Sequence, residues 1–191
     1  MRLLALVGEG MGEATALPSL AARILALAGR SDWKVPRDAI RLPRGLLVDE
    51  RKASPLRPPR KEGFEKAVGV ARAQGASALV VLVDADDDCP VSFGPPAAAL
   101  FHGLAGKAVM AVREFETWLL LNHSPQDLAN AGVKSPERIR DAKKALARLV
   151  PGYLPTTHQL QLARSIDIDQ LRGRSKSFDK FARCVLDVTG S

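Results

Sequence analysis

The chain has 191 residues, of which 46% are hydrophobic and 26% are charged, as is typical of a single globular domain. No run of about 20 apolar residues suggests a membrane span, and the apolar run after Met1 and Arg2 is too short for a secretory leader. Cys89 and Cys184 show no CxxC spacing, so we expect no disulfide framework, no zinc knuckle and a cytoplasmic location.

The formal net charge is +7, from 28 Lys and Arg against 21 Asp and Glu. Eight of the acids fall into three clusters, which leaves 13 acids against the 28 basic residues elsewhere. An acidic pocket in a basic surface suits a metal-dependent enzyme that acts on a polyanion, although a basic surface also serves solubility. The clusters are Glu9 with Glu13, then Asp84 with Asp86, Asp87 and Asp88, and last Glu114 with Glu116.

The first half of the chain predicts strands alternating with amphipathic helices. Residues 3–7 predict a buried strand, and a glycine-rich turn leads from it into a helix that ends at Gly29. Pro18 requires this helix to bend or to begin late. A weaker strand over residues 35–42 and a helix over residues 64–71 follow.

Two further strands complete the predicted sheet. Residues 78–83 are apolar on both faces, as in the centre of a parallel sheet, and residues 108–112 predict the fourth strand. Pro95 and Pro96 predict the first turn of a helix over residues 97–104. The expected fold is a Rossmann-like, doubly wound α/β domain with a mainly parallel four-stranded sheet and helices on both faces.

The remainder of the chain is expected to be helical. Residues 1–123 are assigned to the α/β core and residues 124–191 to a helical extension packed on the same domain. Ser124 and Ser177 are expected to cap helices.

Residues 43–59 form a proline-rich basic stretch that contains Arg44, Arg51 and Lys52. Two interpretations of this stretch are equally favoured: it is an arm that follows phosphate groups and becomes ordered on binding, or it is a flexible connection.

Acids stand where three of the expected strands end. Glu9 follows the first strand, Asp84 and Asp86 follow the third, and Glu114 follows the fourth. In parallel α/β sheets ligands bind beyond the carboxyl ends of the strands, so these acids should converge. Their mutual repulsion is removed by a divalent cation, and hard oxygen ligands suit Mg²⁺ or Mn²⁺.

The glutamate after the first strand and the Asp84-Ala85-Asp86 motif resemble the signature of the toprim fold. The chain also resembles a family of small uncharacterised toprim-related bacterial proteins, whose pattern is a VEGxTE start, an HEFE-like segment, an APSKRI-like segment and an RSxSF helix cap. The corresponding segments here are residues 8–13, 113–116, 134–139 and 174–178, with Gly8 for the usual valine, Gly12 for threonine and Arg113 for histidine.

This resemblance implies Mg²⁺- or Mn²⁺-dependent hydrolysis of phosphodiester bonds in DNA or RNA, with phage defence as a biological role. Tyr153, the only tyrosine, lies in the helical tail, which favours attack by water over a covalent intermediate. The expected catalytic residues are Glu9, Asp84, Asp86 and Glu114, and the expected metal ligands are Glu9, Glu13, Asp84, Asp86 and Asp88. The expected phosphate-binding residues are Arg113, Arg174, Lys176, Arg44, Arg51 and Lys52.

Two other functions remain open. The DxD motif is also typical of nucleotide-sugar transferases, and a degenerate toprim-like domain could bind nucleic acid or an ATPase without catalysis. Glu116 is interpreted as an acid in the first turn of a helix, and Trp118 as a core residue.

Overall fold

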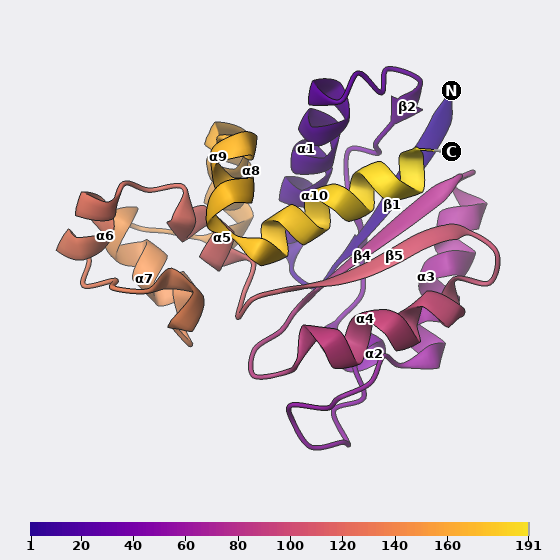
Figure 1. Ribbon diagram of the computed structural model, residues 1–191, viewed down its shortest axis with the longest axis horizontal. Coiled ribbons are helices and arrows are strands. Elements are labelled where there is room, and N and C mark those ends of the chain that lie inside the picture. Colours follow the sequence, from indigo (N-terminus) through magenta and orange to yellow (C-terminus); the bar gives the residue numbers. More distant parts are fainter. Residues whose placement is uncertain (191) are drawn as a thin grey trace.

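The computed structural model describes residues 1–190 as a parallel sheet with helices on both faces (Figure 1). The strand order is β2-β1-β4-β5, and β3 pairs with another stretch of β1. The strands are β1 (Arg2–Gly8), β2 (Trp33–Lys34), β3 (Ile40–Arg41), β4 (Ala78–Asp84) and β5 (Ala105–Ala111). The α/β class and the parallel sheet are therefore confirmed.

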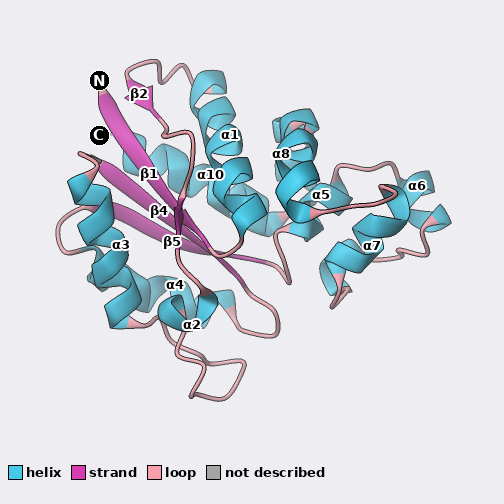
Figure 2. Ribbon diagram, turned by 180° about the vertical axis from the view of Figure 1, so that it is seen from behind, coloured by secondary structure: helices cyan, strands magenta, loops and turns pink. Residues whose placement is uncertain are grey.

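The helices cover the sheet and build a separate group beyond its end (Figure 2). Helices α3 and α4 pack on one face, and α1 and α10 pack on the other. The helices are α1 (Met11–Leu27), α2 (Arg44–Leu47), α3 (Lys61–Ala73), α4 (Pro90–Ala98), α5 (Glu116–Leu121), α6 (Pro125–Asn130), α7 (Ala142–Leu149), α8 (Pro155–Ser165), α9 (Ile168–Arg174) and α10 (Lys176–Thr189), with 3₁₀ turns at Ala99–Phe101 and Pro136–Arg138.

The core divides into two layers because β1 and β4 are apolar on both faces. Leu4 and Leu6 pack into the layer beneath α1 and α10, whereas Ala5 and Val7 pack into the layer beneath α3 and α4. This is the burial pattern that a central parallel strand requires. Trp118 is fully buried in the first layer, which confirms it as a core residue.

Pro18 lies inside α1 and does not end it. A proline cannot donate to the carbonyl four residues earlier, which here belongs to Ala14. The N–H of Ala39 donates to that carbonyl instead, at 2.7 Å, just before β3 begins. The proline thus frees an acceptor that anchors the neighbouring segment to the helix.

Three local predictions are corrected by the structure. The strand expected over residues 35–42 is replaced by the two-residue strands β2 and β3, which flank a turn that contains Pro36. The helix expected over residues 97–104 begins earlier, because Pro90 occupies the first helical turn, where a missing N–H costs little. Ser175, not Ser177, caps α10 by accepting from the N–H of Phe178.

The last helix returns to the sheet. Ser124 caps α6 as expected, and helices α5 to α9 form a group beside the sheet (Figure 1). Helix α10 then crosses the face of β4 and β5, and α8 lies along α1. The residues after 123 therefore contribute to the layer that covers the sheet. No helix within residues 1–190 combines the length and apolarity that a bilayer crossing demands.

The basic stretch of residues 43–59 contains α2 and is closed by an antiparallel bridge between Val48 and Pro59. This stretch packs closely against Gly63 of α3. A Cβ at Gly63 would lie 1.8 Å from the carbonyl oxygen of Leu46, so the contact requires a glycine.

Candidate active site

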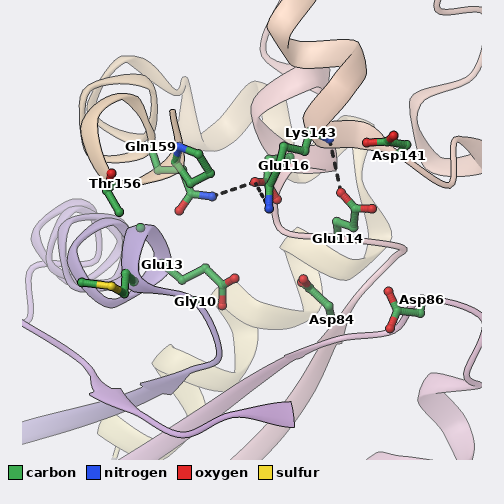
Figure 3. Close-up of a pocket in the computed structure, with 13 residues that line it drawn as sticks. Gly10, Glu13, Asp84, Asp86, Glu114, Glu116, Asp141, Lys143, Thr156 and Gln159 are labelled. Atoms are coloured by element: carbon green, nitrogen blue, oxygen red, sulfur yellow. Dashed lines mark hydrogen bonds and ion pairs between the residues drawn. The ribbon is translucent and has the colours of Figure 1, made fainter. Parts of the chain in front are cut away.

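A cavity of about 380 Å³ lies at the carboxyl end of the strands, between the sheet and the helices that follow residue 115 (Figure 3). Six of its lining residues are acidic and one is basic, in a protein whose net charge is +7. The lining residues are Gly10, Met11, Gly12, Glu13, Asp84, Asp86, Glu114, Glu116, Asp141, Lys143, Pro155, Thr156 and Gln159. The cavity therefore gathers more acidic groups than its one basic side chain could neutralise if all of them were ionised.

Glu9 stands behind the cavity. Its Oε1 accepts a hydrogen bond of 2.7 Å from the N–H of Asp84 and lies 3.6 Å from Nη1 of Arg44. The side chain is only 14% exposed, and burial raises its pKa to about 7 against the attraction of Arg44. Glu9 thus ties the end of β1 to the end of β4 and does not line the cavity.

Glu13 lies in the first turn of α1, and its carboxyl folds back against the glycine-rich turn that precedes the helix. Its Oε2 accepts from the N–H of Glu9 at 3.0 Å, and burial raises the pKa of this carboxyl. A Cβ on Gly10 would lie 2.9 Å from Oε1 of Glu13, so the carboxyl fits against the turn only because a side chain is absent there.

Gly12 allows α1 to approach α8 closely. A Cβ at this position would lie 2.1 Å from Oε1 of Gln159 and 2.6 Å from the backbone oxygen of Pro155. Because one of these contacts is with backbone, the clash could not be relieved by a side-chain rotation alone. The close packing of α1 against α8 therefore requires glycine at position 12, where the resembling family has threonine.

Asp84 ends β4 and faces Glu13 across the cavity (Figure 3). Its Oδ1 accepts from the N–H of Phe115 at 2.8 Å. Burial raises the pKa of Asp84 well above its usual range, and the neighbouring charges of Glu13, Glu9 and Glu116 raise it further. Four carboxyl groups from three segments are therefore close enough to influence one another's charge.

Asp86 and Arg113 have left-handed backbone conformations, with φ of 48° and 63°. The N–H of Asp86 donates to the carbonyl of Arg113 at 2.8 Å, so the two unusual residues support one another. Such conformations cost about 1 kcal/mol or more at residues other than glycine and concentrate at functional sites. This geometry places the half-exposed Asp86 carboxyl at the mouth of the cavity.

Glu114 and Glu116 approach from the other wall. Oε2 of Glu114 accepts from the N–H of Lys143 at 3.2 Å, and burial raises the pKa of Glu114. Oε1 of Glu116 accepts from the amide of Gln159 at 2.9 Å and from the hydroxyl of Tyr153 at 3.3 Å. Burial raises the pKa of the Tyr153 hydroxyl, which therefore remains a donor.

Sequence reasoning missed four cavity residues: Glu116, Asp141, Lys143 and Gln159. Glu116 does lie in the first turn of α5, as interpreted, but it is buried and also faces the cavity. An acid placed inside the apolar run around Trp118 is the one signal that could have revealed it. The other three lie at α7 and α8, whose position no local pattern encodes.

Arg44 is committed to internal ion pairs. Its guanidinium contacts the carbonyl of Asp84 and the carboxyl of Asp88, and lies 3.4 Å from Asp86 and 3.5 Å from Glu50. The Asp88 side chain is fully buried against it, which removes Asp88 from the cavity. Arg44 and Asp88 therefore neutralise each other outside the cavity, and their expected roles in binding phosphate and metal stay predictions.

The remaining phosphate-binding candidates also lie outside the cavity. Arg113 pairs with Asp87, Arg51 pairs with Asp49 at 2.7 Å, and Arg174 donates to the carbonyl of His123 at 3.2 Å. Lys52 is exposed in the basic stretch and Lys176 faces a different groove. The cationic side chain that the structure brings to the cavity is that of Lys143.

The donor set suits a hard cation, since it offers carboxylate oxygens and the buried amide oxygen of Gln159, which has no hydrogen-bond partner. Within residues 1–190, however, no three Asp, Glu, His or Cys side chains are grouped as ready metal ligands. The carboxyls of Glu9, Glu13 and Asp84 are instead turned toward backbone N–H groups. At least one oxygen of each of these three carboxyls therefore already accepts a hydrogen bond.

The fold and the cavity define an α/β protein with an acidic cavity at the carboxyl end of a parallel sheet. Residues 8–185 match the family described as "Domain of unknown function (DUF4276)", and the chain belongs to that family. Comparisons with the curated proteins and with the solved structures each returned no match. The expectation of a domain family of unknown function is confirmed, and its relation to toprim proteins stays a prediction.

Proposed function

We propose that the protein hydrolyses phosphodiester bonds in DNA or RNA with the help of Mg²⁺ or Mn²⁺ bound in the acidic cavity, in a toprim-like arrangement. The observation that carries this proposal is the meeting of Glu13, Asp84 and Glu114 in one cavity with an uncompensated negative charge. A polyanion substrate and a bound cation together would explain both the acidic cavity and the excess positive charge of the rest of the protein.

The carboxyls of Glu13, Asp84, Asp86 and Glu114 are the groups that would hold the ion. A bound divalent cation would neutralise them and polarise a phosphate oxygen. Glu9 acts as a positioning residue, because it fixes the backbone of Asp84 from behind the cavity.

Two other groups have roles that follow from their surroundings. Burial raises the pKa of Glu114 in the metal-free protein, and a bound cation would favour its ionised form. The ammonium of Lys143 is placed to receive a phosphate oxygen at the cavity wall. Arg140, whose side chain is 78% exposed, directly precedes the lining residue Asp141 and lies 3.3 Å from the carboxylate of Asp87.

The test is cleavage of supercoiled plasmid and of single-stranded DNA and RNA with Mg²⁺ or Mn²⁺. Asp84→Asn and Glu114→Gln should each lower the cleavage rate by at least a hundredfold, since each removes a carboxylate from the cavity. Asp169→Asn is the matched control, because Asp169 is an exposed acid on α9, and it should cleave like the wild type. Hydrolysis that persists unchanged in both cavity variants would refute the proposal.

A non-catalytic role is the second candidate, and the hydrogen bonds of the acids favour it. Glu9, Glu13 and Asp84 all accept from backbone N–H groups, as purely structural carboxyls would. The protein would then bind nucleic acid, or an ATPase partner, without cutting. Salt-dependent binding of DNA or RNA with no cleavage under any metal condition would select this alternative.

A further inference from the structure

Ser177 is a buried residue of α10 whose hydroxyl joins this helix to a distant part of the chain. Its Oγ accepts from the N–H of Val112 at 3.2 Å and from the indole N–H of Trp118 at 2.9 Å. These two donors are the ends of residues 112–118, which we call the 112–118 segment. One side-chain oxygen therefore holds both ends of this segment.

The 112–118 segment carries two of the six acids that line the cavity, Glu114 and Glu116. Between them, the N–H of Phe115 donates to Oδ1 of Asp84 at 2.8 Å and joins the segment to the end of β4. Arg113 has a left-handed φ of 63°, a conformation that persists only where its surroundings fix it. The placement of two cavity acids therefore depends on the contacts that fix this backbone.

The hydrogen bonds of Ser177 use every donor and acceptor that a hydroxyl has, which are one proton and two lone pairs. The two lone pairs accept from Val112 and Trp118, so the proton is left for Oγ of Ser175, which lies 3.2 Å away. Alanine at position 177 would leave both N–H groups without this acceptor, and an unpaired buried donor is costly.

Ser175 extends the same network toward another wall of the cavity. Its Oγ donates to Oε1 of Glu137 at 3.1 Å. Because the proton of Ser175 is used in this way, the proton between the two serine hydroxyls comes from Ser177. Glu137 lies in the 3₁₀ turn before α7, and α7 brings Lys143 to the cavity. Two hydroxyls thus connect α10 with the 112–118 segment and with the turn that leads into α7.

We propose that Ser177 is a positioning residue, which fixes the 112–118 segment and thereby keeps Glu114 at the acidic cavity. Ser177 is not among the lining residues, so it acts through the segment. Helix α10 offers a firm anchor, because its Phe178 and Phe181 are fully buried in the core. The consequence for ion binding rests on the proposed function, whereas the effect on the segment does not.

Hydrogen exchange of the metal-free protein tests the effect on the segment. In Ser177→Ala, the N–H groups of Val112 and Phe115 should exchange at least tenfold faster than in the wild type. The rates are taken relative to the amides of α3, on the opposite face of the sheet, which corrects for any loss of overall stability.

Thr189→Ala is the matched control, because Thr189 is a fully buried residue of the same helix whose hydroxyl bonds to carbonyls of α10 itself. It should leave the relative rates within twofold of the wild type. Ser177→Cys keeps the shape of the side chain, but its sulfur is a weak acceptor, so it should change the rates in the same direction by at least threefold. This milder variant replaces Ser177→Ala if the alanine protein does not fold.

Isothermal titration with Mn²⁺ tests the consequence for the cavity. Ser177→Ala should weaken Mn²⁺ binding at least fivefold and Thr189→Ala by less than twofold, whereas a mere loss of stability would not change the affinity of protein that stays folded. Unchanged exchange at Val112 and Phe115, or faster exchange with unchanged Mn²⁺ affinity, would overturn the proposal. If the wild type binds no Mn²⁺, the hydrolase proposal fails, and faster exchange in Ser177→Ala still supports the positioning role.

Discussion

Replacement of Glu9 by glutamine should stabilise the metal-free protein above neutral pH. Burial holds the pKa of Glu9 at about 7 in the folded protein, against 4.5 for an unperturbed glutamate. The folded state therefore holds the proton more tightly than the unfolded state, and stability falls as the pH rises from about 4.5 through 7. At about 1.4 kcal/mol per pH unit, the ionised carboxylate costs up to roughly 3 kcal/mol at pH 8.

Glutamine keeps the oxygen that accepts from the N–H of Asp84 and removes the charge. The difference in unfolding free energy between Glu9→Gln and wild type should thus be near zero at pH 4.5 and approach roughly 3 kcal/mol at pH 8. For a chain of this size that corresponds to a rise in Tm of about 6 to 12 °C.

The assay is thermal unfolding, followed by circular dichroism in EDTA, at intervals between pH 4.5 and 8.5. Asp169→Asn is again the matched control and should follow the wild type. A second series with Mg²⁺ or Mn²⁺ should narrow the difference, because saturation at 100 times the Kd adds about 2.7 kcal/mol to the wild type and a smaller amount to the variant.

Two outcomes would refute this reasoning. Destabilisation of the metal-free protein by Glu9→Gln at pH 8 would show that the ionised carboxylate stabilises the folded state. Equal stabilisation of wild type and variant by the divalent cation would show that the Glu9 charge is not coupled to ion binding.

Two further predictions concern packing around the cavity. Gly12→Ala should lower the free energy of unfolding by about 3 kcal/mol, because the new Cβ would clash with the Pro155 carbonyl oxygen. Urea unfolding measures this loss, and an unchanged midpoint would contradict the close approach of α1 to α8. Arg44→Met should lower the free energy of unfolding by about 3 kcal/mol, because it leaves the buried Asp88 carboxylate without its main partner. Adding Asp88→Asn should recover much of that loss in a double-mutant cycle. Purely additive effects of the two substitutions would contradict the pairing.

The positions where the chain departs from the toprim-related pattern have structural reasons. Gly12 makes room for Gln159, and Gly8 makes room for Leu17 and Glu13, from which a Cβ would be 2.9 and 3.2 Å away. These glycines and the helices that roof the cavity thus belong to one packing arrangement.

The sequence by itself determined the parallel sheet and the acidic strand ends. Continuous apolar runs such as residues 78–83 can be satisfied only in a sheet that is covered on both faces, and the carboxyl ends of parallel strands must share one edge. For that reason Asp84, Asp86 and Glu114 could be grouped before their positions were known.

Only the tertiary structure decided which charges are neutralised and which remain open. Asp86 and Asp88 are two residues apart and both lie near Arg44, yet the Asp88 side chain is fully buried while the half-exposed Asp86 reaches the cavity. Likewise Glu116 gains its role from Gln159, which lies 43 residues further along the chain. Ion pairing and burial depend on distances between elements that are remote in sequence, and the local patterns that predict strands and helices carry no information about those distances.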